Sequence, residues 1–233
     1  MGRFDKIESA HFFIKKIIFD KNNIIGIIYF EEKPLFTGII KYVGNIQKIN
    51  VVSGGKRLIV GIDDKKFLQS LEEGITSIAI NGACHTVEKV EKNSFIVFSS
   101  FETLKKTNIG NLRIGEIVNL ELPLTMQTFL DGHLVLGHID GIGEIINIEK
   151  IGEAYNYRFR TDEYIFNYLV EKDSLAIDGI SLTIFNIKNR NFEVAIIPET
   201  INKTNLKYKR VGSIVNLEIN IFAKYGKKFL ERY

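Results

Sequence analysis

Short runs of apolar residues, separated by glycine, asparagine and aspartate, dominate the chain from Leu35 onward. Runs rich in Ile, Val and Phe occupy residues 75–80, 94–100, 117–122, 157–161, 174–177, 180–187, 192–197 and 214–220. Short β-branched and aromatic runs between turn residues are typical of β-strands. The pattern therefore predicts an all-β protein built from small closed Greek-key barrels, because closure hides the edges of the strands.

Helical periodicity is confined to three segments, residues 64–72, 162–169 and 221–233. The first two are predicted to be short helices between strands. In the third, helical spacing places Phe222, Tyr225, Phe229 and Leu230 on one side. Such an apolar stripe at a chain end either packs on its own domain or drives self-association.

The chain contains an internal duplication. Residues 101–121 return as residues 198–218 with 12 of 21 positions identical, and residues 76–87 return as 173–184 at the same offset of 97. A weaker echo at an offset of 99 pairs the glycines at 38 and 44 with those at 137 and 143. The repeat predicts two tandem similar barrels, residues 35–131 and 132–220, followed by a C-terminal oligomerisation helix at 221–233.

Two similar domains offer two similar pockets. An enzyme that reacts a compound with a second molecule of itself would need such a pair. The alternative is that the duplication serves stability alone, since a fold does not by itself imply a function.

The composition excludes several classes of protein. Of the 233 residues, 45% are hydrophobic and 25% charged, as in an ordinary soluble globular protein. The 31 basic and 28 acidic residues are spread along the chain, which argues against nucleic-acid binding and against an oligonucleotide-binding barrel. The single cysteine, Cys84, cannot form an intramolecular disulfide, which favours a reducing cytoplasm.

The first 34 residues match neither copy of the repeat. Their apolar stretches are broken by Lys15, Lys16 and Lys21 and fall short of the roughly 20 apolar residues that span a bilayer. They also lack a signal-peptide cleavage site. They are expected to be either an extra strand or partner-binding arm, or an extension ahead of a start at Leu35.

Six motifs follow one another in a specific order. They are LFTGII at 35–40, SIAINGACHTV at 77–87, ETLKKTNIG at 102–110, GHLVLGHIDG at 132–141, AIDGISLT at 176–183, and IPET with VNLE near the end. Together they resemble riboflavin synthase from residue 35 to the end of the chain. The resemblance implies a cytoplasmic homotrimer of two-barrel subunits joined by their C-terminal helices, and association with lumazine synthase. It also implies that two molecules of 6,7-dimethyl-8-ribityllumazine dismutate to riboflavin and a ribitylamino-pyrimidinedione, with no cofactor, no metal and no membrane or nucleic-acid partner.

The same resemblance marks four catalytic candidates: Cys84, His138, Ser181 and Lys172. Cys84 and Ser181 occupy equivalent positions in the two copies and form their sharpest difference. A thiolate at Cys84 could add to an electron-poor pteridine carbon or move a proton, although a lone cysteine can also be a small buried apolar group. His138 could move a proton on or off the acidic ring methyl, and Lys172 could hold a ring oxygen or a ribityl hydroxyl. His133 in the same motif is either functional or structural.

The resemblance places the active site between the first barrel of one subunit and the second barrel of its neighbour. Short hydroxyl and backbone groups there suit a ribityl chain and a uracil-like edge. Assigned to the first pocket are Gly38, Ile39, Ile40, Thr86, Glu102 and Thr103, and to the second Gly137, Ser181, Thr183, Ile197 and Thr200. Further predicted contacts are Phe36, Thr37, Ser77, His85, Ile139, Leu182 and Asn220.

Several residues depart from the family pattern. Asn220 stands where an aspartate is expected, which removes a carboxylate from the neighbourhood of the site. His85, Leu122 and Asp131 replace the usual leucine, arginine and glycine. These changes leave open a non-catalytic lumazine or flavin carrier, but the difference between Cys84 and Ser181 favours an enzyme, because simple binding does not require different groups in the two pockets.

Removing the residues before Phe36 is expected to preserve or improve riboflavin formation from the lumazine, because an arm ahead of Phe36 would lie close to the first pocket. The measurement is the rate of riboflavin appearance for the full and the trimmed chain. A clear loss on trimming would show that the arm is structural.

Overall fold

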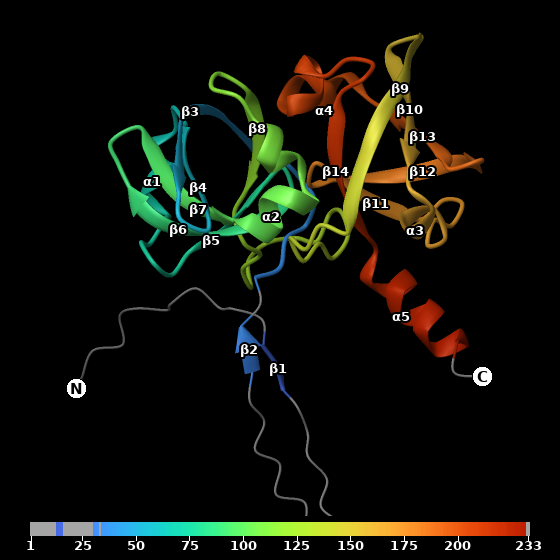
Figure 1. The fold of residues 1–233 in the computed structure, drawn as a ribbon. Coiled ribbons are helices and arrows are strands. Elements are labelled where there is room, and N and C mark those ends of the chain that lie inside the picture. The colour runs from blue at the N-terminus through green and yellow to red at the C-terminus, as the bar shows by residue number, and fades with distance from the viewer. Residues whose placement is uncertain (1–12, 16–29, 33, 232–233) are drawn as a thin grey trace, which may run out of the picture.

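The computed structural model describes residues 13–15, 30–32 and 34–231, and their fold is two closed antiparallel barrels that lie side by side (Figure 1). In the first barrel the strand order is β3-β4-β7-β6-β5-β8, and the second repeats it as β9-β10-β13-β12-β11-β14. The first is built from β3 (Tyr42–Val52), β4 (Gly55–Gly61), β5 (Ser77–Ile80), β6 (Ala83–Val90), β7 (Ser94–Ser100) and β8 (Ile117–Glu121). The second is built from β9 (Gly141–Ile151), β10 (Ala154–Thr161), β11 (Ser174–Ile177), β12 (Ile180–Lys188), β13 (Asn191–Ile196) and β14 (Ile214–Ile219). The prediction of two tandem β-barrels is confirmed.

Short helices occupy equivalent places in the two barrels. The first has α1 (Lys65–Gln69), α2 (Phe101–Lys106) and the 3-10 helix η1 (Asn108–Asn111), and the second has α3 (Glu163–Phe166), α4 (Pro198–Lys203) and η2 (Asn205–Tyr208). The last helix, α5 (Ile221–Leu230), projects away from the second barrel (Figure 1). Ahead of the barrels, β1 (Phe13–Lys15) pairs with β2 (Phe30–Glu32), while residues 1–12 and 16–29 of the unmatched N-terminal segment lie outside the described residues.

The apolar pattern found eight of the twelve barrel strands. Each predicted run corresponds to one of β5, β7, β8 and β10–β14, whereas β3, β4, β6 and β9 were not predicted. β3 and β9 have few buried positions, and β4 and β6 include charged residues that interrupt the apolar run. The helices α1, α3 and α5 lie within predicted segments. The helices α2 and α4 bury no residue at all, so they carry no apolar periodicity for the sequence to show.

Each barrel interior is packed with its own apolar cluster. In the first, Phe67 of α1 lies 6.1 Å from Phe95, between ring centroids, and in the second Phe159 stacks on Phe192 at 5.3 Å. These rings are fully or almost fully buried. Among the described residues, no helix has the length and apolar character that crossing a membrane requires.

A short segment precedes each barrel, and we name residues 34–40 the first strap and residues 132–140 the second strap. Each strap lies against the barrel that it does not precede in the sequence. The two straps pair with each other, because Phe36 N donates to Val135 O (2.8 Å) and Val135 N to Phe36 O (3.1 Å). The first strap then runs along the second barrel, where Ser181 N donates to Gly38 O (2.8 Å). The first strap therefore precedes the first barrel in sequence and lies against the second barrel in space.

The second strap makes the equivalent contact with the first barrel. Cys84 N donates to Gly137 O at 2.9 Å. Gly38 and Gly137 both have φ +75°, and a Cβ atom on them would lie 2.7 Å from Ser181 Cβ and 2.6 Å from Cys84 Cβ. Only glycine permits this approach, because both the backbone conformation and the space exclude a side chain.

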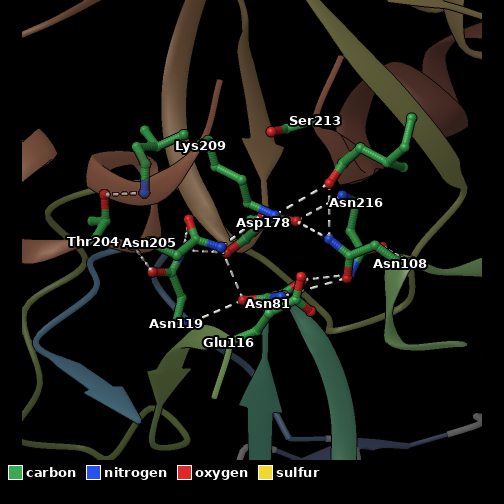
Figure 2. Close-up of polar contacts among 12 residues, drawn as sticks. Asn81, Asn108, Glu116, Asn119, Asp178, Thr204, Asn205, Lys209, Ser213 and Asn216 are labelled. Atoms are coloured by element: carbon green, nitrogen blue, oxygen red, sulfur yellow. Dashed lines mark hydrogen bonds and ion pairs between the residues drawn. The ribbon is translucent and has the colours of Figure 1, made fainter. Parts of the chain in front are cut away.

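A buried polar network, which we name the junction network, joins the two barrels (Figure 2). Its connections are reciprocal: Asn119 Nδ2 donates to Asp178 O (2.9 Å), and Asn216 Nδ2 donates to Asn81 O (2.8 Å). All of its members are less than 5% exposed, and they are Asn81, Asn108, Asn119, Asp178, Asn205 and Asn216. Buried amides of this kind are stable only when they are paired, so the network fixes how the barrels dock.

The junction network is symmetric except at one charge. Asp178 occupies the position of Asn81, and Lys209, whose Nζ lies 3.4 Å from Asp178 Oδ2, occupies the position of Leu112. Asp178 also accepts from the side chains of Asn108 and Asn205, both at 2.8 Å. The second copy thus contains a buried acid and its counter-ion that the first copy lacks.

The substitution Asp178→Asn is expected to lower the free energy of unfolding by about 3 kcal/mol or more, because Lys209 would keep a nearly buried charge without its partner. Adding Lys209→Leu, the residue found at the equivalent position 112, should recover most of that loss. Urea denaturation of the two single variants and the double variant measures this. Additive losses would show that the pair is not coupled.

Candidate functional site

Two cavities lie at equivalent places on the two barrels. The Cys84 cavity has a volume of about 350 Å³ and is lined by Ala83, Cys84, Ser100, Glu102, Thr103, Lys106, Thr107, Gly137, His138 and Ile139. The Ser181 cavity has a volume of about 520 Å³ and is lined by Gly38, Ile39, Ile40, Lys41, Val43, Ile180, Ser181, Glu199, Thr200, Asn202, Lys203 and Thr204. Volumes of this size suit a small organic ligand.

Each cavity is built from three pieces of chain. A barrel strand supplies Cys84 or Ser181, a short helix (α2 or α4) supplies a glutamate, a threonine and a lysine, and a strap supplies the remaining wall. The strap belongs to the other half of the repeat. The grouping expected from the sequence is therefore wrong in this respect: Gly38, Ile39 and Ile40 line the cavity of the second barrel, and Gly137 that of the first.

The serine of the Ser181 cavity pairs with a histidine of the second strap that is not itself among the lining residues. His133 Nδ1 lies 2.7 Å from Ser181 Oγ, and His133 N donates to Thr37 O at 3.1 Å, which ties the second strap to the first. Burial lowers the pKa of His133, while the nearby Asp173 opposes this shift. The imidazole is therefore neutral near pH 7 and can exchange a hydrogen bond or a proton with the hydroxyl.

The Cys84 cavity has no equivalent imidazole at that place, because the position of His133 is taken by Pro34 in the first copy. Burial raises the pKa of Cys84 to about 11, with a hydrogen bond to Ser77 opposing the shift and the charge of Glu218 adding to it. The side chain is therefore a thiol at neutral pH. This disagrees with the expected thiolate, which needs a positive or polar environment that lowers the pKa.

Two buried carboxylates hold the straps. Glu121 at the end of β8 is 7% exposed and Glu218 near the end of β14 is 2% exposed. Burial raises the pKa of Glu121 to about 7 against the opposing hydrogen bonds from Thr37 and Gly38. Burial likewise raises the pKa of Glu218 to about 7, against the opposing hydrogen bond from Leu136 and the charge of Lys224.

Eleven of the predicted site residues line one of the two cavities, and the structure places the others outside their walls. Phe36 is fully buried among the straps, and Thr37 donates to Glu121. His85 and Leu182 face the barrel interiors. Lys172 is exposed, with its Nζ 5.0 Å from the centre of the Phe185 ring. The others are Ser77, Thr86, Thr183, Ile197 and Asn220.

Asn220 has a structural role that the sequence did not suggest. Its Oδ1 accepts from Phe222 N at 3.1 Å and so caps α5, and its Nδ2 donates to Asp173 Oδ1 at 2.8 Å. Asparagine and aspartate cap helices about equally well. An amide, unlike a carboxylate, can also donate to Asp173.

Sequence reasoning missed Lys106, Thr107, Lys203 and Thr204 in the cavities, and the anchors Glu121 and Glu218. A signal was present, because both copies carry identical KTN and VNLE motifs. Identity between copies was used to find the repeat and was not used to find the site. No group of side chains with metal-ligating chemistry occurs in the part of the chain that the structure describes.

The sequence model of the Lumazine binding domain matches two segments, residues 37–123 and 136–220. The chain belongs to the lumazine-binding domain family. A curated riboflavin synthase from Actinobacillus pleuropneumoniae is 44% identical over 196 residues, which cover 84% of this chain and 90% of that protein. Riboflavin synthase from Bacillus subtilis (strain 168) is 37% identical, covering 85% of this chain and 91% of that protein. Riboflavin synthase from Schizosaccharomyces pombe is 33% identical, covering 85% and 95%.

Solved structures with a similar fold include LumP complexed with 6,7-dimethyl-8-(1'-D-ribityl) lumazine, with a TM-score of 0.71 at 24% identity. The match covers 79% of this chain and 98% of that chain. LumP complexed with riboflavin gives a TM-score of 0.73. At this identity the likeness shows the shared fold. The two lumazine-binding domains of this chain start within the straps, at residues 37 and 136. Each domain therefore begins with a segment that contacts one barrel and continues into the strands of the other barrel.

A buried histidine distinguishes the first lumazine-binding domain from the second. His85 is 4% exposed, its Nδ1 lies 2.8 Å from Ala83 O and its Nε2 lies 2.7 Å from Ser99 Oγ. The second domain has Leu182 and Ile196 at these positions. Burial lowers the pKa of His85 to about 4, so the ring is neutral, donates from Nδ1 to the carbonyl and accepts from the hydroxyl.

The double variant His85→Leu/Ser99→Ile, which copies the second domain, is expected to lose less stability in acid than the parent chain. The folded-state pKa of His85 lies below the unfolded value of 6.5, so its contribution is complete above pH 6.5 and is lost as the pH falls to about 4. Between pH 6.5 and about 4, the parent chain should lose about 3 kcal/mol more of its free energy of unfolding than the double variant. Urea denaturation from pH 4 to 7.5 measures it, and parallel profiles would contradict it.

Proposed function

We propose that this chain is a riboflavin synthase. It transfers a four-carbon unit between two molecules of 6,7-dimethyl-8-ribityllumazine and yields riboflavin and 5-amino-6-(ribitylamino)pyrimidinedione. The two substrate molecules contain all the atoms of the two products, so the reaction needs no oxidant, reductant or cofactor. The enzyme is a transferase.

The observation that carries the proposal is the pair of equivalent cavities with different polar groups. Glu102 and Thr103 of one cavity correspond to Glu199 and Thr200 of the other, as expected of two sites for the same compound. Cys84 corresponds to Ser181, as expected when one molecule gives carbons and the other receives them. The identity of 33–44% to curated riboflavin synthases, over more than four fifths of the chain, supports the same conclusion.

Most of the rate enhancement is proposed to come from holding the two ring systems in register. Effective molarities for well-oriented reactants reach roughly 10⁵ M or more. In the Ser181 cavity, the neutral His133 orients the Ser181 hydroxyl toward a bound ring. In the Cys84 cavity, the imidazole of His138 is proposed to take a proton from the acidic methyl of the other ring, and the neutral thiol of Cys84 to donate one.

The two rings are proposed to meet between chains. The Cys84 cavity and the Ser181 cavity share no lining residue, so one chain holds its two ligands in separate places. Helix α5 supports oligomerisation, because Phe222, Tyr225, Phe229 and Leu230 are between 56% and 80% exposed. A homotrimer would cover this stripe and bring the Cys84 cavity of one chain to the Ser181 cavity of the next. Association with lumazine synthase and a cytoplasmic location stay predictions of the resemblance.

The purified chain is expected to form riboflavin from 6,7-dimethyl-8-ribityllumazine alone, as followed by absorbance. The variant Cys84→Ser should form it much more slowly, because a hydroxyl replaces the thiol beside the ring. Tight binding of the lumazine without riboflavin formation would contradict the proposal and identify a carrier.

Mixing two defective chains tests where the site lies. Cys84→Ser and Ser181→Ala are each expected to be weak alone, since every site contains one altered cavity. Subunit exchange between them would create interfaces with two unaltered cavities, so activity should reappear in the mixture. A mixture no more active than its components would place the reaction within one chain.

A further inference from the structure

Each strap is held by a glutamate, Glu121 for the first strap and Glu218 for the second. Each glutamate belongs to one barrel, and the strap that it holds lines the cavity of the other barrel. Glu121 of the first barrel accepts three hydrogen bonds from the first strap. Its Oε1 accepts from Thr37 N (2.7 Å) and Thr37 Oγ1 (2.8 Å), and its Oε2 accepts from Gly38 N (3.2 Å). The opposite edge of the strap holds Ser181 N through Gly38 O. The first strap is therefore clamped between Glu121 and the Ser181 cavity.

Glu218 makes the matching arrangement in the second barrel. Its Oε1 accepts from Leu136 N (2.7 Å), and its Oε2 accepts from His138 N (3.1 Å). Gly137, between these two residues, holds Cys84 N from the other side. The second strap is therefore clamped between Glu218 and the Cys84 cavity.

We infer that Glu121 and Glu218 are positioning residues whose effects are crossed: Glu121 shapes the Ser181 cavity of the second barrel, and Glu218 shapes the Cys84 cavity of the first. The inference rests on the proposed function only in treating these cavities as the substrate sites. Neither carboxylate lines a cavity, so each shapes its cavity through its strap. The charge of Glu218 also reaches Cys84, whose pKa it raises.

A carboxylate is required at these positions because two backbone N–H groups converge on it. Both carboxylate oxygens accept, whereas an amide of the same size would turn its own N–H toward one of these donors. Burial raises the pKa of both glutamates to about 7, so both are mainly ionised only above that pH, where hydrogen bonds to the charged acceptor are about twice as strong as those between neutral groups. Replacing either glutamate with glutamine therefore keeps the volume of the side chain but sets its NH₂ group against a backbone N–H of the strap.

The single cysteine provides a reporter for one cavity. Glu218→Gln is expected to speed the reaction of Cys84 with iodoacetamide roughly tenfold, which corresponds to about 1.4 kcal/mol, because its strap would no longer hold the backbone beside the thiol. The rate is measured as a function of pH, because the charge of Glu218 also raises the pKa of Cys84. A rate profile that only shifts to lower pH would show a charge effect and overturn the inference. Glu121→Gln is the matched control, with the same chemical change at the equivalent position. It should leave the rate within about twofold, although urea denaturation should show that both variants lose stability.

A reciprocal chain reports on the other cavity. In Cys84→Ser/Ser181→Cys, the introduced thiol at position 181 should be sensitised by Glu121→Gln and not by Glu218→Gln. General loosening of the protein would sensitise both thiols in both variants, which would overturn the inference. The inference would also be overturned if Glu121→Gln sensitised Cys84 and Glu218→Gln sensitised the thiol at position 181, since each pair belongs to one barrel.

Ligand binding gives a second readout that does not need turnover. Riboflavin is the probe, and its fluorescence is titrated against each variant of the parent chain. Each single variant should weaken one class of site roughly tenfold and leave the other unchanged. Crossed thiol sensitivity in a chain that forms no riboflavin would leave the positioning role intact and count against the synthase alone.

Discussion

The structure depends on burying a set of side-chain amides between two barrels. Each barrel brings asparagines whose partners are backbone groups of the other barrel, as when Asn119 donates to Asp178 O and Asn216 donates to Asn81 O. Buried amides lose their water, and they are stable only when these partners are in place. The barrels can therefore dock in one register. Apolar packing alone would tolerate sliding between the barrels, whereas this pattern of donors and acceptors does not.

That register is what completes the cavities. The straps cross at the junction, so the wall of each cavity comes from the chain segment that leads into the other barrel. A change in docking would move Gly38 relative to Ser181 and Gly137 relative to Cys84, and both contacts leave no space for a methyl group. The walls of the cavities and the docking of the barrels are thus parts of one arrangement, held by the junction network between the barrels and by Glu121 and Glu218 at the straps.

The near-symmetry of the two halves makes their differences informative. Cys84 corresponds to Ser181, and His133, which pairs with Ser181, corresponds to Pro34. Cys84 N and Ser181 N make equivalent backbone bonds to Gly137 O and Gly38 O, but the side chains differ. Pro34 has neither an imidazole nor the N–H that His133 donates to Thr37 O, so the two cavities differ in their polar groups. Inside the barrels, the pair His85 and Ser99 replaces Leu182 and Ile196 without changing the strand order. Glycines and backbone hydrogen bonds position the straps against the barrels, and single side chains such as Cys84 and Ser181 set the polar groups of each cavity.

The sequence by itself determined the class of fold, the duplication and the equivalence of Cys84 with Ser181, because strand periodicity and repeated motifs are local properties that survive in one dimension. Through the resemblance it also singled out Gly38, Gly137, Thr103 and Thr200, which line the two cavities. Only the tertiary structure decided which strap belongs to which cavity, because pairing between Phe36 and Val135 joins residues 99 positions apart in the sequence. It likewise decided that His85 points inward, and that Cys84 is a thiol at neutral pH. Burial sets both of these properties, and burial depends on neighbours that only the folded chain brings together.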